Sequence, residues 1–143
     1  SDAVIHEVQR CADLIPMNVP HRVVRDTEFR GFLLPKGTDV YPLLSTALHD
    51  PAMFKFPDCF NPSNFLDSSG RFQKNDAFVP FSSGKRLCLG ESLARMELFL
   101  FLTTILQHFQ LQPLQPPEQL SDQPLESGFA NIPPLFQLKV LPR

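Results

Sequence analysis

The chain has 143 residues, 43% of them hydrophobic, and a formal net charge of -2. This length fits one modest globular domain, and a nearly neutral chain without a basic run gives no reason to expect a nucleic-acid partner. Its three cysteines, Cys11, Cys59 and Cys88, form no C-x-x-C pair and cannot all be paired. A disulfide scaffold and a four-ligand zinc site are therefore not expected.

The first part of the chain predicts one helix followed by short strands. Residues 2–13 place Val4, Ile5 and Val8 on one side of a helix, which Pro16 prevents from continuing. Short strands are expected at Val23–Val24, at Phe29, over 32–34 and at Val40–Tyr41, and a helical turn over 43–48. The chain begins inside a helical pattern without an initiator methionine, and we therefore expect it to be part of a longer protein.

The second part predicts an irregular segment and one long helix. Residues 51–80 contain repeated prolines and phenylalanines, and a run of this length without regular structure is usually functional. A helix is expected over 89–110, with apolar residues almost all round, which is typical of a helix buried in a large protein. Its longest purely apolar run, 98–102, is far shorter than the ~20 residues that a membrane-spanning helix needs. Short extended pieces follow over 111–143, and neither repeats nor a domain boundary are evident.

The stretch FSSGKRLCLG (residues 81–90) places Cys88 at the start of this long helix. Unsatisfied N–H groups and the helix dipole favour an anion there, and the cation of Arg86 adds to the effect. Cys88 is therefore better placed to be a thiolate than Cys11 or Cys59. Gly90 lets a flat group approach the helix start. A thiolate, a flat neighbour and a nearby arginine together indicate haem iron with an axial cysteine.

The same stretch, Phe81-x-x-Gly84-x-Arg86-x-Cys88-x-Gly90, resembles the haem-binding signature of the cytochrome P-450 family. Five specified residues at this spacing occur by chance on the order of 10⁻⁷ per position. Sequences such as DAFVPFSSGKRLCLGESLARMELFLFLTTILQHF are similar to the vertebrate microsomal family-two enzymes.

The resemblance implies a mainly α fold with a small β portion. Its expected order is helix K, β strands, meander, cysteine loop, helix L and terminal hairpin. Residues 1–143 would then be the C-terminal haem-binding part of a single, incomplete cytochrome P-450 domain. A longer parent would explain how the long apolar helix is covered.

The resemblance also implies a cofactor site for haem b. Cys88 would be the axial ligand of the iron, and Arg86 would pair with a haem propionate. Phe81 would pack over the sulfur and exclude water, although it could equally be an ordinary core residue. His21 would reach a propionate, or could simply be satisfied by a protein partner. Signature residues Gly84 and Gly90 complete the cofactor site, and no other residue of this chain is expected to be catalytic.

Glu7-x-x-Arg10 resembles the E-x-x-R of helix K, which implies a structural ion pair. In the family an arginine of the meander completes this pair, because a buried charge without partners is costly. Asn64 occupies that position here, as a neutral or weakly basic residue does in family-two members. How Glu7 and Arg10 share their remaining hydrogen bonds is therefore left open.

Two mostly apolar loops resemble the segments that contact a small hydrophobic substrate, or they could be loops that pack on each other. They consist of Met17, Asn18 and Val19 after the first helix, and Phe129, Ala130, Asn131 and Ile132 near the C-terminus. Lys85, Lys74 and Arg71 could form part of a basic face for an acidic electron-donor protein, or could be scattered surface cations.

The implied activity is that of a haem-thiolate monooxygenase acting on xenobiotics, fatty acids or steroids. Its parent would take electrons from NADPH through cytochrome P-450 reductase, with cytochrome b5 as a further partner. It would lie on the cytoplasmic face of the endoplasmic reticulum membrane, anchored through an N-terminal part outside these residues. The alternatives are a haem-thiolate isomerase or dehydratase, and a truncated chain that is inactive by itself. The sequence does not identify the substrate.

Overall fold

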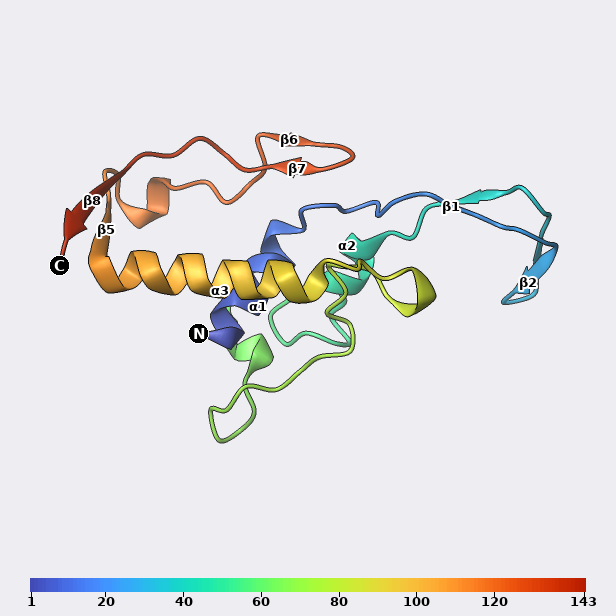
Figure 1. Cartoon of the computed structure of the whole chain (residues 1–143), viewed down its shortest axis with the longest axis horizontal. Coiled ribbons are helices and arrows are strands. Elements are labelled where there is room, and N and C mark those ends of the chain that lie inside the picture. Colours follow the sequence, from blue (N-terminus) through green and yellow to red (C-terminus); the bar gives the residue numbers. More distant parts are fainter.

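The computed structural model describes the backbone of residues 1–143 and every side chain except that of Pro117. Its helices are α1 (Asp2–Ala12), α2 (Leu44–Leu48) and α3 (Glu91–His108), with 3-10 turns η1 (Pro62–Phe65), η2 (Gly84–Arg86) and η3 (Pro117–Gln119). Antiparallel pairs join β1 (His21–Arg22) to β4 (Asp39–Val40), β2 (Thr27–Phe29) to β3 (Phe32–Leu34), β5 (Phe109–Pro113) to β8 (Leu138–Pro142), and β6 (Glu126–Ser127) to β7 (Asn131–Ile132). Helices with small sheets agree with the expected mainly α class with a small β portion (Figure 1).

Helix α1 has the predicted position, and charged residues occupy much of the side that it buries. Val4 and Val8 are exposed, whereas the buried residues of the helix are Ala3, Ile5, Glu7 and Arg10. The apolar side that carries Val4 and Val8 is therefore not the side that this chain buries. The physical reason is that η1 packs on α1 where the two charged side chains bond to the irregular segment. Asp13, in the left-handed region at φ 40°, ends the helix before Pro16.

The irregular segment 51–80 supplies most of the small core. Phe54 and Phe65 are buried together with Ala3 of α1, and their ring centroids are 5.9 Å apart. Phe78 packs against this cluster with its ring edge-on to Phe65. The phenylalanines of a segment without regular strands thus fix its path over α1.

The short strands lie at or near their predicted positions, with one exception. The predicted strand at Val23–Val24 was wrong, since the strand lies two residues earlier, at His21–Arg22, where His21 pairs with Val40. Val23 instead bonds to the turn that ends the hairpin, because its N–H donates to Thr38 and its carbonyl accepts from Gly37. Gly37 has φ 91°, a conformation that favours glycine.

Helix α3 runs along the middle of the molecule and none of its residues is buried (Figure 1). It begins two residues later than predicted, because Gly90 is its N-cap, and it ends where Phe109 enters β5. The described chain therefore leaves the apolar sides of α3 largely exposed, although Ala94 and Leu102 are half-buried, and this agrees with the expectation drawn from the sequence. Within the part of the chain that the structure describes, no helix is long and apolar enough to cross a membrane.

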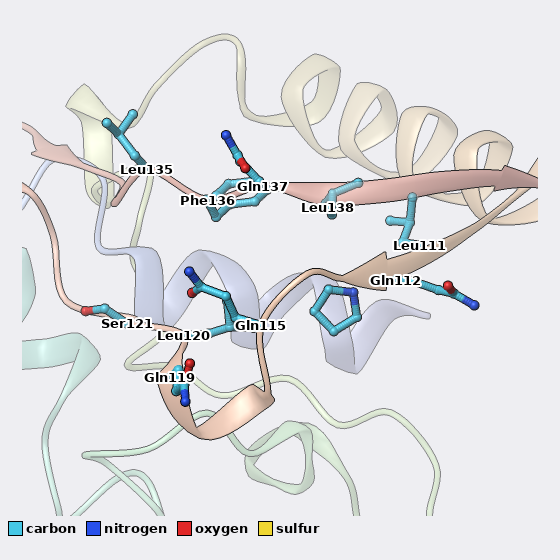
Figure 2. A pocket seen from close by; sticks show the side chains of 11 residues that line it. Leu111, Gln112, Gln115, Gln119, Leu120, Ser121, Leu135, Phe136, Gln137 and Leu138 are labelled. Carbon is cyan, nitrogen blue, oxygen red and sulfur yellow. The ribbon is translucent and has the colours of Figure 1, made fainter.

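A cleft of about 450 Å³ is lined by the paired strands β5 and β8 and by the loop that follows β5. Figure 2 shows Phe136 and Leu138 on one side and Leu111 and Leu120 on the other. This cleft adjoins the C-terminal end of α3, whereas Cys88 precedes its N-terminal end. It contains none of the residues predicted for the cofactor site.

Candidate functional site

The cysteine loop, residues 81–90, is closed by its own backbone hydrogen bonds. The N–H of Cys88 donates to the carbonyl of Phe81 at 2.9 Å, and the N–H of Leu87 donates to Gly84 at 3.2 Å. Gly84 begins η2 at φ 72°, in the left-handed region that favours glycine. The carbonyl of Cys88 then accepts from the N–H of Glu91 at 3.3 Å, which leads the loop directly into α3.

The side chain of Cys88 is exposed at the N-terminus of α3. Gly90 caps this helix without any side-chain hydrogen bond, and the start of a helix favours a negatively charged group. A Cβ built on Gly90 would lie 3.7 Å from the sulfur of Cys88, so glycine leaves open the space beside the sulfur. Leu89 is fully exposed, and Leu87 is 43% exposed. An accessible thiol with a bare glycine and apolar flanks fits the axial face of a flat macrocycle.

The remaining predicted cofactor residues lie in different surroundings. Arg86, at the end of η2, is exposed and takes part in none of the ion pairs among the described residues. His21 is half-buried in β1, and no described hydrogen bond joins it to the cysteine loop. The structure therefore places Arg86 beside Cys88 along the chain but does not bond His21 to them. No group of three or more His, Cys, Asp or Glu side chains among the described residues could hold a metal ion.

Phe81 is half-buried and is held by a side chain that the sequence analysis did not identify. The guanidinium of Arg95 lies over the ring of Phe81, 5.5 Å from its centroid, and over Phe78 at 5.2 Å. Arg95 pairs with Glu91 at 2.8 Å and lies 2.7 Å from Nε2 of His6. The i,i+4 spacing of Glu91 and Arg95 was a signal available in the sequence.

His6 joins α1 to this arrangement. Its Nδ1 lies 2.8 Å from the carbonyl of Asp2, which makes Nε2 the acceptor for Arg95. Burial lowers the pKa of His6 below 6.5 against the effect of the Asp2 carbonyl, and the positive charge of Arg95 lowers it further. A neutral His6 is what this contact requires.

Glu7 and Arg10 form a fully buried ion pair, since both side chains have 0% exposure. Arg10 donates to both carboxylate oxygens of Glu7 at 2.8 Å. Its other N–H groups donate to backbone carbonyls of four residues, Leu48, Phe56, Pro57 and Cys59. The hydrogen bonds with Glu7 raise the pKa of Arg10 although burial opposes this. The guanidinium of Arg10 thus donates its hydrogen bonds to the carboxylate of Glu7 and to backbone carbonyls of α2 and of the irregular segment.

Asn64 provides the remaining partner of Glu7, which the sequence had left open. Its amide Nδ2 donates to Oε1 of Glu7 at 3.1 Å and to the carbonyl of Phe56 at 3.0 Å. The N–H of Asn61 donates to the same carboxylate oxygen at 2.7 Å. Burial alone would raise the pKa of Glu7, but the bonds from Arg10, Asn61 and Asn64 together lower it. The neutral amide of Asn64 therefore bonds to Glu7 at the position where the family has an arginine.

Both predicted substrate segments bond to residues just after α1, and on the first segment the N–H of Asn18 donates to the carbonyl of Ile15 at 3.2 Å. Asn131 donates through its N–H to the carbonyl of Leu14 at 3.0 Å and through its side chain to Asp13 at 2.8 Å. Asn18 donates to Ser82 of the cysteine loop at 2.9 Å. The apolar members of the two segments remain exposed, namely Met17, Val19, Phe129 and Ile132.

The three predicted basic residues are not equivalent. Arg71 pairs with Asp67 at 3.3 Å, whereas Lys85 is exposed within η2. Lys74 lines a cleft of about 590 Å³ together with Phe81, Gly84 and Arg95. Lys74 and Lys85 therefore border the cysteine loop, and Arg71 already has a partner.

Comparisons with known proteins identify the family of the chain. The family model described as Cytochrome P450 matches residues 1–140. Over its whole length the chain is 62% identical to rabbit (Oryctolagus cuniculus) Cytochrome P450 2G1 and 64% identical to human (Homo sapiens) Cytochrome P450 2F1, and it spans 29% of each. It is also 57% identical to a human protein named "Putative inactive cytochrome P450 2G1", of which it covers 98%.

Proposed function

Since the chain belongs to the cytochrome P450 family, we propose that Cys88 is the axial thiolate ligand of a haem b. The observation that carries this proposal is the exposed sulfur at the start of α3. This helix start has no side-chain cap, and Gly90 leaves open the space beside the sulfur. When bound, haem b supplies the iron that activates O₂, and a thiolate ligand favours O–O cleavage. The helix dipole of α3 stabilises the negative sulfur that such ligation needs.

The other residues of the cofactor site would bind a haem propionate, shield the sulfur from water or hold the loop in place. Arg86 would pair with a propionate, because its guanidinium is exposed and takes part in no described ion pair. Phe81 would cover the sulfur against water, and the contact of its ring with Arg95 fixes it in place. His21 would reach a propionate, and Gly84 would hold the turn that presents the loop.

The full-length protein is proposed to be a monooxygenase that inserts one oxygen atom from O₂ into a small hydrophobic substrate such as a xenobiotic, fatty acid or steroid. Segments 17–19 and 129–132 would form part of its substrate pocket, since Asn18 bonds to Ile15 and Asn131 bonds to Leu14, just after the end of α1. NADPH-cytochrome P-450 reductase would supply the electrons, with cytochrome b5 as a further partner. Lys74 and Lys85 would form part of the docking face. The endoplasmic reticulum membrane is the proposed location.

The 143-residue chain alone is proposed to be inactive. Helix α3 has no buried residue, so an isolated chain would expose its apolar sides to water. A human relative of nearly the same extent carries the word "inactive" in its name. The chain would then hold the thiolate side of the site without the opposite side, where substrate and O₂ bind.

Isotope incorporation tests this function. The full-length protein that carries this chain is incubated with reductase, NADPH, ¹⁸O₂ and a panel of small alkoxyaromatic compounds. We expect NADPH-dependent products that carry one ¹⁸O atom, and no product from the 143-residue chain under the same conditions. Conversion without O₂ or reductase would instead identify an isomerase or dehydratase, and would contradict the proposed monooxygenase activity.

A further inference from the structure

One side-chain hydrogen bond joins the loop after α1 to the cysteine loop. Nδ2 of Asn18 donates to Oγ of Ser82 at 2.9 Å, across 64 positions of the sequence. Asn18 is only 7% exposed, and its Oδ1 accepts from the N–H of Val19 at 2.7 Å. Both ends of its amide are therefore engaged within the protein, which leaves little of this side chain for a substrate.

Asn18 and Ser82 both have a backbone conformation that is unfavourable for a residue other than glycine. Asn18 has φ 56° and Ser82 has φ 66°, in the left-handed region that non-glycine residues seldom adopt. Asparagine tolerates this region better than serine does. The N–H of Asn18 donates to Ile15, and the N–H of Ser82 donates to Val79. Two unusual loop conformations thus support each other through one hydrogen bond.

Ser82 is the residue directly after Phe81, whose carbonyl accepts from the N–H of Cys88 at 2.9 Å. A short path of hydrogen bonds and backbone therefore runs from Asn18 to the sulfur-bearing residue. On the other side, the bond from Asn18 to the N–H of Val19 sets the direction of the segment that exposes Met17 and Val19. The two loops are connected at the point where each changes direction.

We propose that Asn18 and Ser82 are a pair of positioning residues that couples the substrate segment 17–19 to the cysteine loop. This inference rests on the proposed function, because it takes segment 17–19 as substrate-facing and Cys88 as the haem ligand. Asn18 then acts through Met17 and Val19 rather than by touching the substrate itself. Since coupling between sites is reciprocal, a change in either loop should alter the behaviour of both.

The test uses Asn18→Gly, Ser82→Gly and the double variant in the haem-loaded full-length protein. Glycine keeps the positive φ at both positions and removes only the hydrogen-bonding side chain. Optical titration with a small apolar substrate gives the substrate Kd. The loss of the red-shifted ferrous-carbonyl Soret band in mild urea gives the stability of thiolate ligation. Ser83→Gly is the matched control, because Ser83 has φ -148° and its side chain makes no capping bond.

Each single variant should raise the substrate Kd and the rate of loss of the Soret band by about threefold to tenfold. This range corresponds to the net contribution of one hydrogen bond. In the double variant both quantities should rise no further than in the more strongly affected single variant. Ser83→Gly should resemble the wild type. A Ser82→Gly protein with unchanged substrate Kd, or effects that multiply in the double variant, would overturn the coupling. Ser82→Ala, which removes only the hydroxyl oxygen, should give the same shift if the glycine variants load no haem. A wild-type protein without the red-shifted band would contradict the proposed function, whereas failure confined to the variants contradicts the coupling alone.

Discussion

Replacement of Glu7 by glutamine should strongly destabilise the protein although the side chain keeps its size. Oε1 of Glu7 accepts from Arg10, Asn61 and Asn64, and Oε2 accepts from Arg10. Whichever oxygen the amide NH₂ of glutamine replaces, it faces at least one N–H donor. The substitution therefore removes the counter-charge of Arg10 and also places an amide NH₂ against at least one N–H donor.

The expected cost follows from what Arg10 retains. Loss of one partner of a buried ion pair typically costs 3–5 kcal/mol. Arg10 keeps its bonds to four backbone carbonyls, of Leu48, Phe56, Pro57 and Cys59. These dipoles still stabilise the guanidinium, so we expect the lower end of that range, about 3 kcal/mol.

Urea unfolding of the haem-loaded full-length protein measures this cost. The matched control is Asp39→Asn, the same carboxylate-to-amide change in the exposed pair of Asp39 with Arg22, which should not shift the midpoint measurably. The pKa of Glu7 is lowered from 4.5, so its stabilising charge is present above that value and is lost as pH falls through the lowered pKa. The deficit of Glu7→Gln should accordingly shrink at acid pH. A Glu7→Gln midpoint equal to that of Asp39→Asn would refute the reasoning.

Two further predictions concern titratable groups. Because burial lowers the pKa of His6 below 6.5, the unfolded chain binds a proton that the folded chain does not, and stability should fall as pH drops from 6.5 through the folded pKa. His6→Gln should flatten that slope in urea midpoints measured across this range, and an unchanged slope would show that His6 is not its source. Iodoacetamide should label Cys59 but not Cys11 in the haem-loaded protein, because burial raises the pKa of Cys11 to about 11. Removal of haem should make Cys88 reactive as well, and labelling of Cys88 before removal would contradict its ligation.

The sequence was sufficient for the features that depend on local pattern. The signature from Phe81 to Gly90 identified the family, which the comparisons confirm, and the apolar pattern of the long helix predicted its lack of cover within this chain. The extent of the domain, residues 1–143, stays a prediction. Helix boundaries were displaced by one or two residues because caps such as Gly90 are set by backbone conformation.

The buried face of α1 could not be predicted from apolar periodicity. It is occupied by Glu7 and Arg10, whose partners are mainly backbone carbonyls and N–H groups of a segment about 40 to 60 residues away. Backbone groups are present at every residue and leave no signal in side-chain identity. The bond between Asn18 and Ser82 was missed for a related reason, since it joins two loops whose course depends on tertiary structure.

The most direct test of the central claim is the ferrous-carbonyl spectrum of the full-length protein with and without the sulfur of Cys88. Thiolate ligation predicts a red-shifted Soret band in the wild type and its loss in Cys88→His, while Cys59→His keeps it. A Cys88→His protein that retains the red-shifted band would show that another side chain holds the iron.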